Sequence, residues 1–241
     1  CGFDGVKLFV GPDSAGADPG PACYGRGGPL AITDINVFLG RIPIEHFPFP
    51  LNREVIGERL QDLCRQIAGE TSHHYTPRAL AFGYLEIANA NMAKAIRSVS
   101  LARGYDPREY LLVAFGGAAG QHACAIGTEL KIPRILVHPA AGILSAYGIG
   151  LADVIKHRAC GIYRNWDDFD CDLETVFAQL SKELEKEMAA EGLPLAKANK
   201  SYALELRYLG TDAALLVREP ADGDYRAAFQ RDHQQRYGYC Y

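Results

Sequence analysis

Residues 110–138 read YLLVAFGGAAGQHACAIGTELKIPRILVH, and this stretch decides the fold that we expect. Residues 110–115 are a continuous apolar run, which is typical of a strand covered on both faces. Glycines then turn the chain, residues 121–130 have the pattern of a helix, and a second strand is predicted over residues 134–138. Strand, turn, helix and strand within about 30 residues form a βαβ unit, so we predict an α/β fold with a parallel sheet.

The segment before this unit is rich in turn-forming residues. A short strand is expected over residues 6–10, and residues 11–29 (GPDSAGADPGPACYGRGGP) hold too much Gly and Pro for a helix or an interior strand. They are also too apolar for a flexible linker. We predict an ordered loop. It either belongs to a functional site or forms a rigid cover over a sheet edge.

Two helices are predicted from their capping residues. Thr33 or Asp34 is expected to cap a short helix over residues 35–39, and Asn52 a longer one over residues 53–69.

The longest helical pattern covers about residues 78–103, and a closely packed helix is expected within residues 140–152, where small residues dominate. Four polar positions of the longest helix are assigned to a solvated face: Asn89, Asn91, Lys94 and Arg97.

The composition changes after residue 153, so we expect two domains, residues 1–158 and residues 159–241. The second is predicted to be a small α+β domain that is incomplete in this chain, in which Phe169 contributes to a helical stripe. Its expected elements are a helix over 167–191, a hairpin of strands 202–208 and 213–217, and a helix over 223–236.

The composition excludes several classes of protein. The chain has 241 residues, 48% hydrophobic and 22% charged, with a net charge of −4, which gives no general attraction to nucleic acid or anionic membranes. No apolar run reaches the roughly 20 residues of a membrane helix. Seven cysteines without a CxxC pair indicate neither a disulfide framework nor a zinc site, and we expect no metal site and a cytoplasmic location.

Because the chain starts at Cys1 and ends on an aromatic run, we expect a piece of a longer polypeptide.

The turn at residues 116–120 is the strongest local signal of chemistry. Glycines between a buried strand and a helix let the backbone approach a ligand, and helix N-terminal amides favour anionic or polar groups. The pattern is neither GxGxxG nor a Walker loop. Two explanations stay open: a nucleotide or anion site, or close packing of the helix on the strand.

Other candidate residues also have two explanations each. His122, expected to be neutral near a helix N-terminus, either contacts a ligand or packs locally. Asp18 is either an active-site acid or a turn former. His73, His74 and His138 are assigned to structural or surface roles. A nucleophilic role for Cys23 or Cys124 is disfavoured because no activating base is identifiable.

Long segments of the chain resemble the hydantoinase A/5-oxoprolinase family. The resemblance rests on residues 114–154 (AFGGAAGQHACAIGTELKIPRILVHPAAGILSAYGIGLADV), on residues 11–41, on residues 86–107 and on LRYLGTD with HQQRYGY near the end. It therefore covers nearly the whole chain. The sequence GQHACA at residues 120–125 is closer to the 5-oxoprolinase branch than to the hydantoinase branch.

The resemblance implies part of an actin-like, acetate-kinase-like ATPase that uses ATP with Mg²⁺. The phosphate-binding Asp-x-Gly-Gly-Thr motifs of such folds are not found in this chain. By position the glycine turn resembles the adenosine motif, with Ala119 where the family often has glycine. The residues expected to face the nucleotide are Gly116, Gly117, Ala118, Ala119, Gly120 and Gln121.

The function implied by the resemblance is ATP-dependent opening of 5-oxoproline to glutamate. Two alternatives are kept: an ATP-using hydantoinase or ketone carboxylase subunit, and a nucleotide-binding scaffold without catalysis. The expected partners are a small cyclic amide, the remainder of the polypeptide and a hydantoinase B-like domain or subunit, within an oligomer. The catalytic residues stay unknown, with His122 and Asp18 as candidates.

Overall fold

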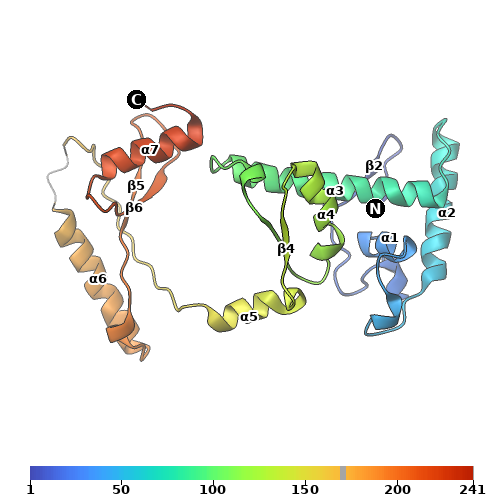
Figure 1. Cartoon of the computed structure of the whole chain (residues 1–241), viewed down its shortest axis with the longest axis horizontal. Helices are drawn as coiled ribbons and strands as arrows, with labels where there is room; N and C mark the ends of the chain where they lie inside the picture. Colours follow the sequence, from blue (N-terminus) through green and yellow to red (C-terminus); the bar gives the residue numbers. More distant parts are fainter. Residues whose placement is uncertain (169–171, 241) are drawn as a thin grey trace. The chain divides into compact units, whose positions relative to one another are not determined.

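The computed structural model describes residues 1–168 and 172–240, which form two compact units. The first unit is Cys1–Tyr147 and the second is Gly148–Tyr241, and each is described by itself (Figure 1). The domain boundary predicted at residue 158 lies in a segment without helix or strand and stays a prediction.

The first half of unit 1 is mainly helical. A small antiparallel hairpin stands where one strand over residues 6–10 was predicted. The elements are β1 (Gly2–Phe3), β2 (Leu8–Phe9), η1 (Ala22–Tyr24), α1 (Ile32–Phe38), η2 (Ile44–His46), α2 (Arg53–Glu70) and α3 (Pro77–Leu101).

Capping side chains explain where two of these helices begin. The Asn52 side chain accepts hydrogen bonds from the backbone N–H groups of Glu54 and Val55, which confirms the predicted cap of α2. Thr76 caps α3 in the same way. The cap predicted for residues 35–39 was wrong, because α1 begins three residues earlier.

The core of this half lies where α1, α2 and α3 meet. Its fully buried side chains come from all three helices: Ile35, Val37, Ile56, Leu60, Ile67, Leu80 and Tyr84. Figure 1 shows α3 running on from this core to lie beside α4. Helix α3 therefore joins the helical half of the unit to the βαβ half.

The second half of unit 1 is the predicted βαβ unit. Strands β3 (Leu112–Ala114) and β4 (Ile135–Val137) are parallel, with Leu112 opposite Ile135 and Ala114 opposite Val137. Helix α4 (Ala123–Leu130) connects them. Three shorter 3-10 helices and one α-helix accompany it: η3 (Pro107–Glu109), η4 (Ala119–Gln121), η5 (Ala141–Ile143) and α5 (Leu144–Leu151).

Two packing predictions in this region were wrong. The strands are not covered on both faces, because the side chains of Val113 and Val137 are 42% and 55% exposed. The helix within residues 140–152 is not closely packed either, since Ile149 of α5 is 78% exposed. Apolar composition indicates which residues require cover but does not say which part of the polypeptide supplies it.

Unit 2 is the predicted small α+β unit. It contains α6 (Leu173–Ala190), η6 (Leu195–Lys197), an antiparallel hairpin of β5 (Ala203–Leu206) and β6 (Leu215–Arg218), and α7 (Tyr225–Tyr237). Leu215 and Val217 pack with Tyr225 and Phe229 in its core. The predicted hairpin is confirmed with shorter strands, and the expected contribution of Phe169 lies outside the described residues.

These elements confirm the α/β class, with a parallel βαβ unit followed by a small α+β unit. No helix among the described residues is long and apolar enough to cross a membrane.

Candidate functional site

The glycine turn follows the carboxyl end of β3 and leads into η4 and α4. Its first residue, Gly116, has a φ of +87°, which favours glycine, and its N–H donates to the carbonyl of Ala141 at 2.7 Å. Gly116, Gly117, Ala118 and Gly120 are exposed, and Ala119 and Gln121 are half-buried.

The surroundings of the glycines bear on the two explanations that the sequence left open. No atom of the described residues would lie within 4 Å of a Cβ added at Gly116, Gly117 or Gly120. A Cβ at Gly127 of α4, in contrast, would come within 2.9 Å of Ile135 Cδ1. Gly127 therefore lies in close contact with the Ile135 side chain of β4, a contact that the sequence alone did not indicate. Packing against the described residues does not explain Gly117 and Gly120.

His122 directly follows the turn and is 5% exposed. Its Nδ1 lies 2.8 Å from Asn89 Oδ1 of α3, and its Nε2 lies 3.4 Å from Asn36 Nδ2 of α1. Burial, and then the positive charge of Arg41, lower the pKa of His122. The expectation of a neutral imidazole thus has a physical basis in this site, and whether His122 takes part in catalysis stays a prediction.

The polar residues of α3 do not all share a solvated face. Lys94 and Arg97 are exposed, as predicted, and Arg97 pairs with Glu129 of α4 at 3.6 Å. The prediction was wrong for Asn89, which is half-buried against His122. Asn91 is exposed and also donates a hydrogen bond to the Val10 carbonyl at 3.4 Å.

Arg41, just beyond α1, contacts the turn from another side. Its guanidinium Nη2 donates to the carbonyl of Gln121, and its backbone N–H donates to the carbonyl of Asn36 at 2.8 Å. Asn36 of α1 and Arg41 just beyond it therefore contact the two residues that follow the glycine turn, His122 and Gln121.

Asp34 organises the Gly/Pro-rich loop. This fully buried carboxylate accepts backbone N–H groups from Ala22 at 3.0 Å, from Cys23 at 2.7 Å and from Ala31 at 2.7 Å. Asp34 was expected to precede the helix as a cap. It instead lies in the first turn of α1, where it accepts the N–H of Ala31 and also binds residues up to 12 positions away.

The other candidates in the loop have different surroundings. Burial and the Asp34 carboxylate raise the pKa of the Cys23 thiol to about 12, which disfavours a nucleophilic role. Cys124 is exposed. Asp18 is exposed within the turn of residues 16–19, and its role stays a prediction.

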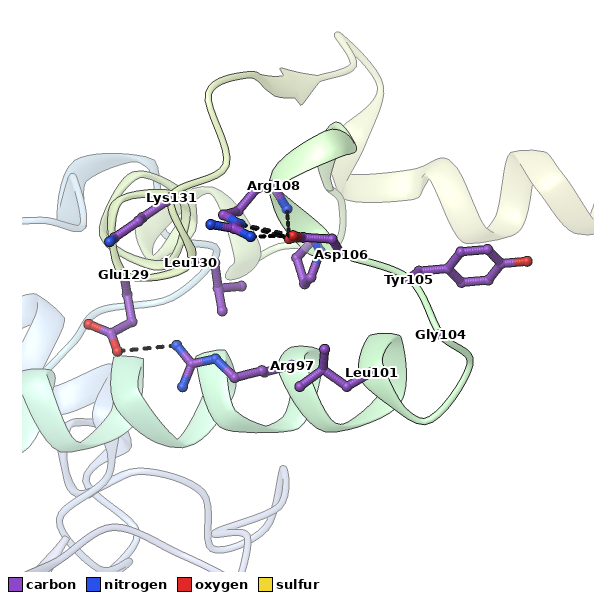
Figure 2. A pocket seen from close by; sticks show the side chains of 10 residues that line it. Arg97, Leu101, Gly104, Tyr105, Asp106, Arg108, Glu129, Leu130 and Lys131 are labelled. Carbon is purple, nitrogen blue, oxygen red and sulfur yellow. Dashed lines mark hydrogen bonds and ion pairs between the residues drawn. The ribbon is translucent and has the colours of Figure 1, made fainter. Parts of the chain in front are cut away.

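A surface pocket of about 480 Å³ lies at the ends of α3 and α4, away from the glycine turn. Figure 2 shows Arg97 facing Glu129, and Arg108 facing Asp106, whose pKa the Arg108 hydrogen bond lowers to about 2. Since α4 has 8 residues, its far end is about 12 Å from His122. Arg97 and Arg108 are both paired with carboxylates there, and the pocket lies away from the end of β3, so we take the glycine turn as the candidate site.

No group of three or more metal-binding side chains was found among the described residues.

Comparison with known proteins agrees with the resemblance of the motifs. The hydantoinase/oxoprolinase family model matches residues 1–158. A 5-oxoprolinase of Pestalotiopsis fici is 39% identical over 96% of this chain, and one of Dictyostelium discoideum is 35% identical over 98%. The chain spans 19% and 20% of the length of these two relatives.

Solved structures extend the likeness to the fold. The crystal structure of an ATP-dependent caprolactamase from Pseudomonas jessenii matches 99% of this chain and 36% of its own, with a TM-score of 0.72 and 29% identity. A nucleotide-free acetone carboxylase matches 96% of this chain and 35% of its own, with a TM-score of 0.64 and 21% identity, and this second likeness concerns the fold alone. On these grounds the chain belongs to the hydantoinase/oxoprolinase family.

Proposed function

We propose that this chain supplies the adenosine-facing turn of an ATP-dependent amidohydrolase that opens 5-oxoproline to glutamate. The observation that carries the proposal is the turn at the carboxyl end of β3, where Gly117 and Gly120 are not required by packing within the described chain. Backbone without side chains lets a ligand approach closely, and parallel sheets bind ligands at this end of their strands.

The proposed contacts to the nucleotide come from residues 116–121. Gly116, Gly117 and Ala118 would lie against the base and ribose, where small side chains leave room. The N-terminal end of α4 adds backbone N–H groups that favour polar or anionic atoms. Ala119 adds one methyl group to this surface and narrows the approach only slightly.

The remainder of the enzyme supplies the phosphate and Mg²⁺ sites in this proposal. In the reaction, the γ-phosphoryl group of ATP passes to the amide oxygen of the lactam, with ADP leaving, and water then attacks the activated carbon. Breaking of the carbon–nitrogen bond opens the ring and leaves an acyl phosphate on the side chain, and a second water hydrolyses this acyl phosphate to glutamate and phosphate. Positioning and neutralisation of charge carry most of the catalysis in such transfers.

Exposed apolar side chains of unit 1 support a larger assembly. They include Val113 of β3, Leu136 and Val137 of β4, and Tyr147 at the end of the unit. Patches of this kind favour contact with further protein. We propose that the rest of the polypeptide and a hydantoinase B-like domain or subunit accompany this chain, within a cytoplasmic oligomer.

A substrate panel tests the proposal in the full-length enzyme. ADP and glutamate formed together from ATP and 5-oxoproline support it. The caprolactamase subunit of Pseudomonas jessenii, 33% identical over 84% of this chain, is a reason to include other lactams, beside hydantoins and ketones. Turnover with those compounds but not with 5-oxoproline would contradict the proposed substrate. Nucleotide binding without any turnover would contradict the proposal that the full-length protein is an enzyme.

A further inference from the structure

We propose that His122, Asn36, Asn89 and Arg41 form a positioning network that sets the glycine turn for the nucleotide, an inference that rests on the proposed function. The four residues come from three separate parts of unit 1: the end of α1, the middle of α3 and the start of α4. Asn36 and Asn89 contact the His122 side chain, and Arg41 contacts the neighbouring Gln121 carbonyl. None of the four belongs to residues 116–121, which are expected to face the nucleotide.

The hydrogen bonds of the imidazole fit one protonation state. Asn89 Oδ1 is an acceptor, so the Nδ1 that lies 2.8 Å away carries the proton. The unprotonated Nε2 then accepts from Asn36 Nδ2 at 3.4 Å. A neutral imidazole with its proton on Nδ1 donates to Asn89 and accepts from Asn36. With both ring nitrogens engaged and the side chain buried, His122 acts through the backbone that it anchors.

The backbone of His122 transmits the position of the ring to the turn. Its N–H donates to the Ala119 carbonyl at 3.1 Å and closes η4, and its carbonyl accepts the Ile126 N–H at 3.0 Å and opens α4. A displacement of the ring therefore displaces residues 119–121. The guanidinium of Arg41 supports the same segment by donating to the Gln121 carbonyl.

An unpaired atom marks the weaker side of the network. Asn36 is buried, and its Oδ1 has no hydrogen-bond partner within the described part of the chain. Natural interiors rarely leave such an atom unpaired. The Asn89 contact is the shorter of the two, so we assign the larger share of the positioning to Asn89.

Three substitutions of His122 separate the two sides. His122→Asn retains an amide N–H near the Nδ1 position, His122→Gln places its amide near Nε2, and His122→Phe removes both contacts. We expect the KM for ATP in the full-length enzyme to rise about tenfold for Phe and for Gln and less for Asn, the scale of one buried hydrogen bond. The kcat should stay within about twofold, because a nucleotide-binding contact remote from the reacting atoms acts equally on ground and transition states.

Substitutions on α3 give a matched control, and a substitution of Arg41 gives a variant that leaves the core intact. Asn89→Ala should raise the KM for ATP, whereas Asn91→Ala on the same helix should not, since Asn91 is exposed and contacts Val10 instead. Arg41 is exposed, so Arg41→Ala should fold even where a His122 variant does not, and it should also raise the KM for ATP.

The outcomes separate this inference from the proposed function. A wild-type enzyme that binds no ATP contradicts the proposed function. A wild-type enzyme that binds ATP, with an unchanged KM for ATP in Arg41→Ala and Asn89→Ala, overturns the network alone. A fall in kcat at constant KM for ATP in His122→Gln also overturns it, because His122 would then act on the chemical step.

Discussion

The loop of residues 11–29 and the turn of residues 116–120 are both rich in glycine, but their glycines have different surroundings. In the loop, a Cβ at Gly28 would overlap the carbonyl oxygen of Gly20. In the turn, no described residue would contact a Cβ at Gly117 or Gly120. Packing therefore requires a glycine at position 28 of the loop, whereas it does not require Gly117 or Gly120 of the turn within the described chain.

This difference separates two roles that a glycine-rich sequence does not distinguish. The loop folds around the buried Asp34 carboxylate and packs Gly28 against the Gly20 carbonyl, so we expect Gly28 to contribute to stability. The turn presents bare backbone at the end of a strand, so we expect its glycines to contribute to binding. Substitutions at the two segments should therefore affect different measurements.

The largest expected effect on stability is that of Gly28→Ala. The added methyl group cannot fit beside the Gly20 carbonyl, so the loop must change its backbone path. We expect a loss of more than about 3 kcal/mol in the free energy of unfolding, measured by urea titration. Gly117→Ala is the matched control, with a change below about 0.5 kcal/mol. Equal losses in the free energy of unfolding for Gly28→Ala and Gly117→Ala would contradict the difference between the loop and the turn.

Asp34→Asn should have the next largest effect. The amide can accept on only one side, so at least one of the N–H groups of Ala22, Cys23 and Ala31 loses its acceptor. We expect a loss of about 2 to 4 kcal/mol in the free energy of unfolding. Hydrogen exchange of these three amides should accelerate, while exchange in α4 should not. Unchanged protection of Ala22 and Cys23 would contradict the role of Asp34.

The smallest expected effect is the pH dependence due to His122. The folded-state pKa of His122 lies below the ordinary histidine value of 6.5, so the unfolded state binds more protons near that pH. This contribution to stability is complete above pH 6.5 and is lost as the pH falls through that value towards the folded-state pKa. Urea titrations on either side of this window should show a smaller acid loss for His122→Asn than for wild type. Equal acid losses would show that His122 does not titrate differently on folding.

The sequence predicted the elements that depend on local chemistry. Asn52 caps α2 because its side chain bonds groups two and three residues ahead, and the apolar runs around the turn form β3 and β4 as expected. The role of Asp34 depends on Ala22 and Cys23, and that of Asn89 on His122, 33 residues away. Local capping and periodicity rules cannot find such partners, because only the folded chain brings them together.

For the candidate site, too, the sequence indicates local features but not their surroundings in space. The glycine turn was identified from its place between a strand and a helix, but its two explanations differ only in what surrounds each glycine in space. Gly127, which lies in close contact with the Ile135 side chain of β4, looks like any other helical glycine in the sequence. A glycine on the strand-facing side of a connecting helix is the signal that could have indicated it.

The most direct test of the central claim is calorimetric titration of the full-length enzyme with ATP, comparing wild type with Gly117→Val. We predict that the added side chain weakens ATP binding at least about tenfold, which is 1.4 kcal/mol, with the melting temperature unchanged. An ATP affinity equal to that of wild type would contradict the assignment of residues 116–121 to the nucleotide.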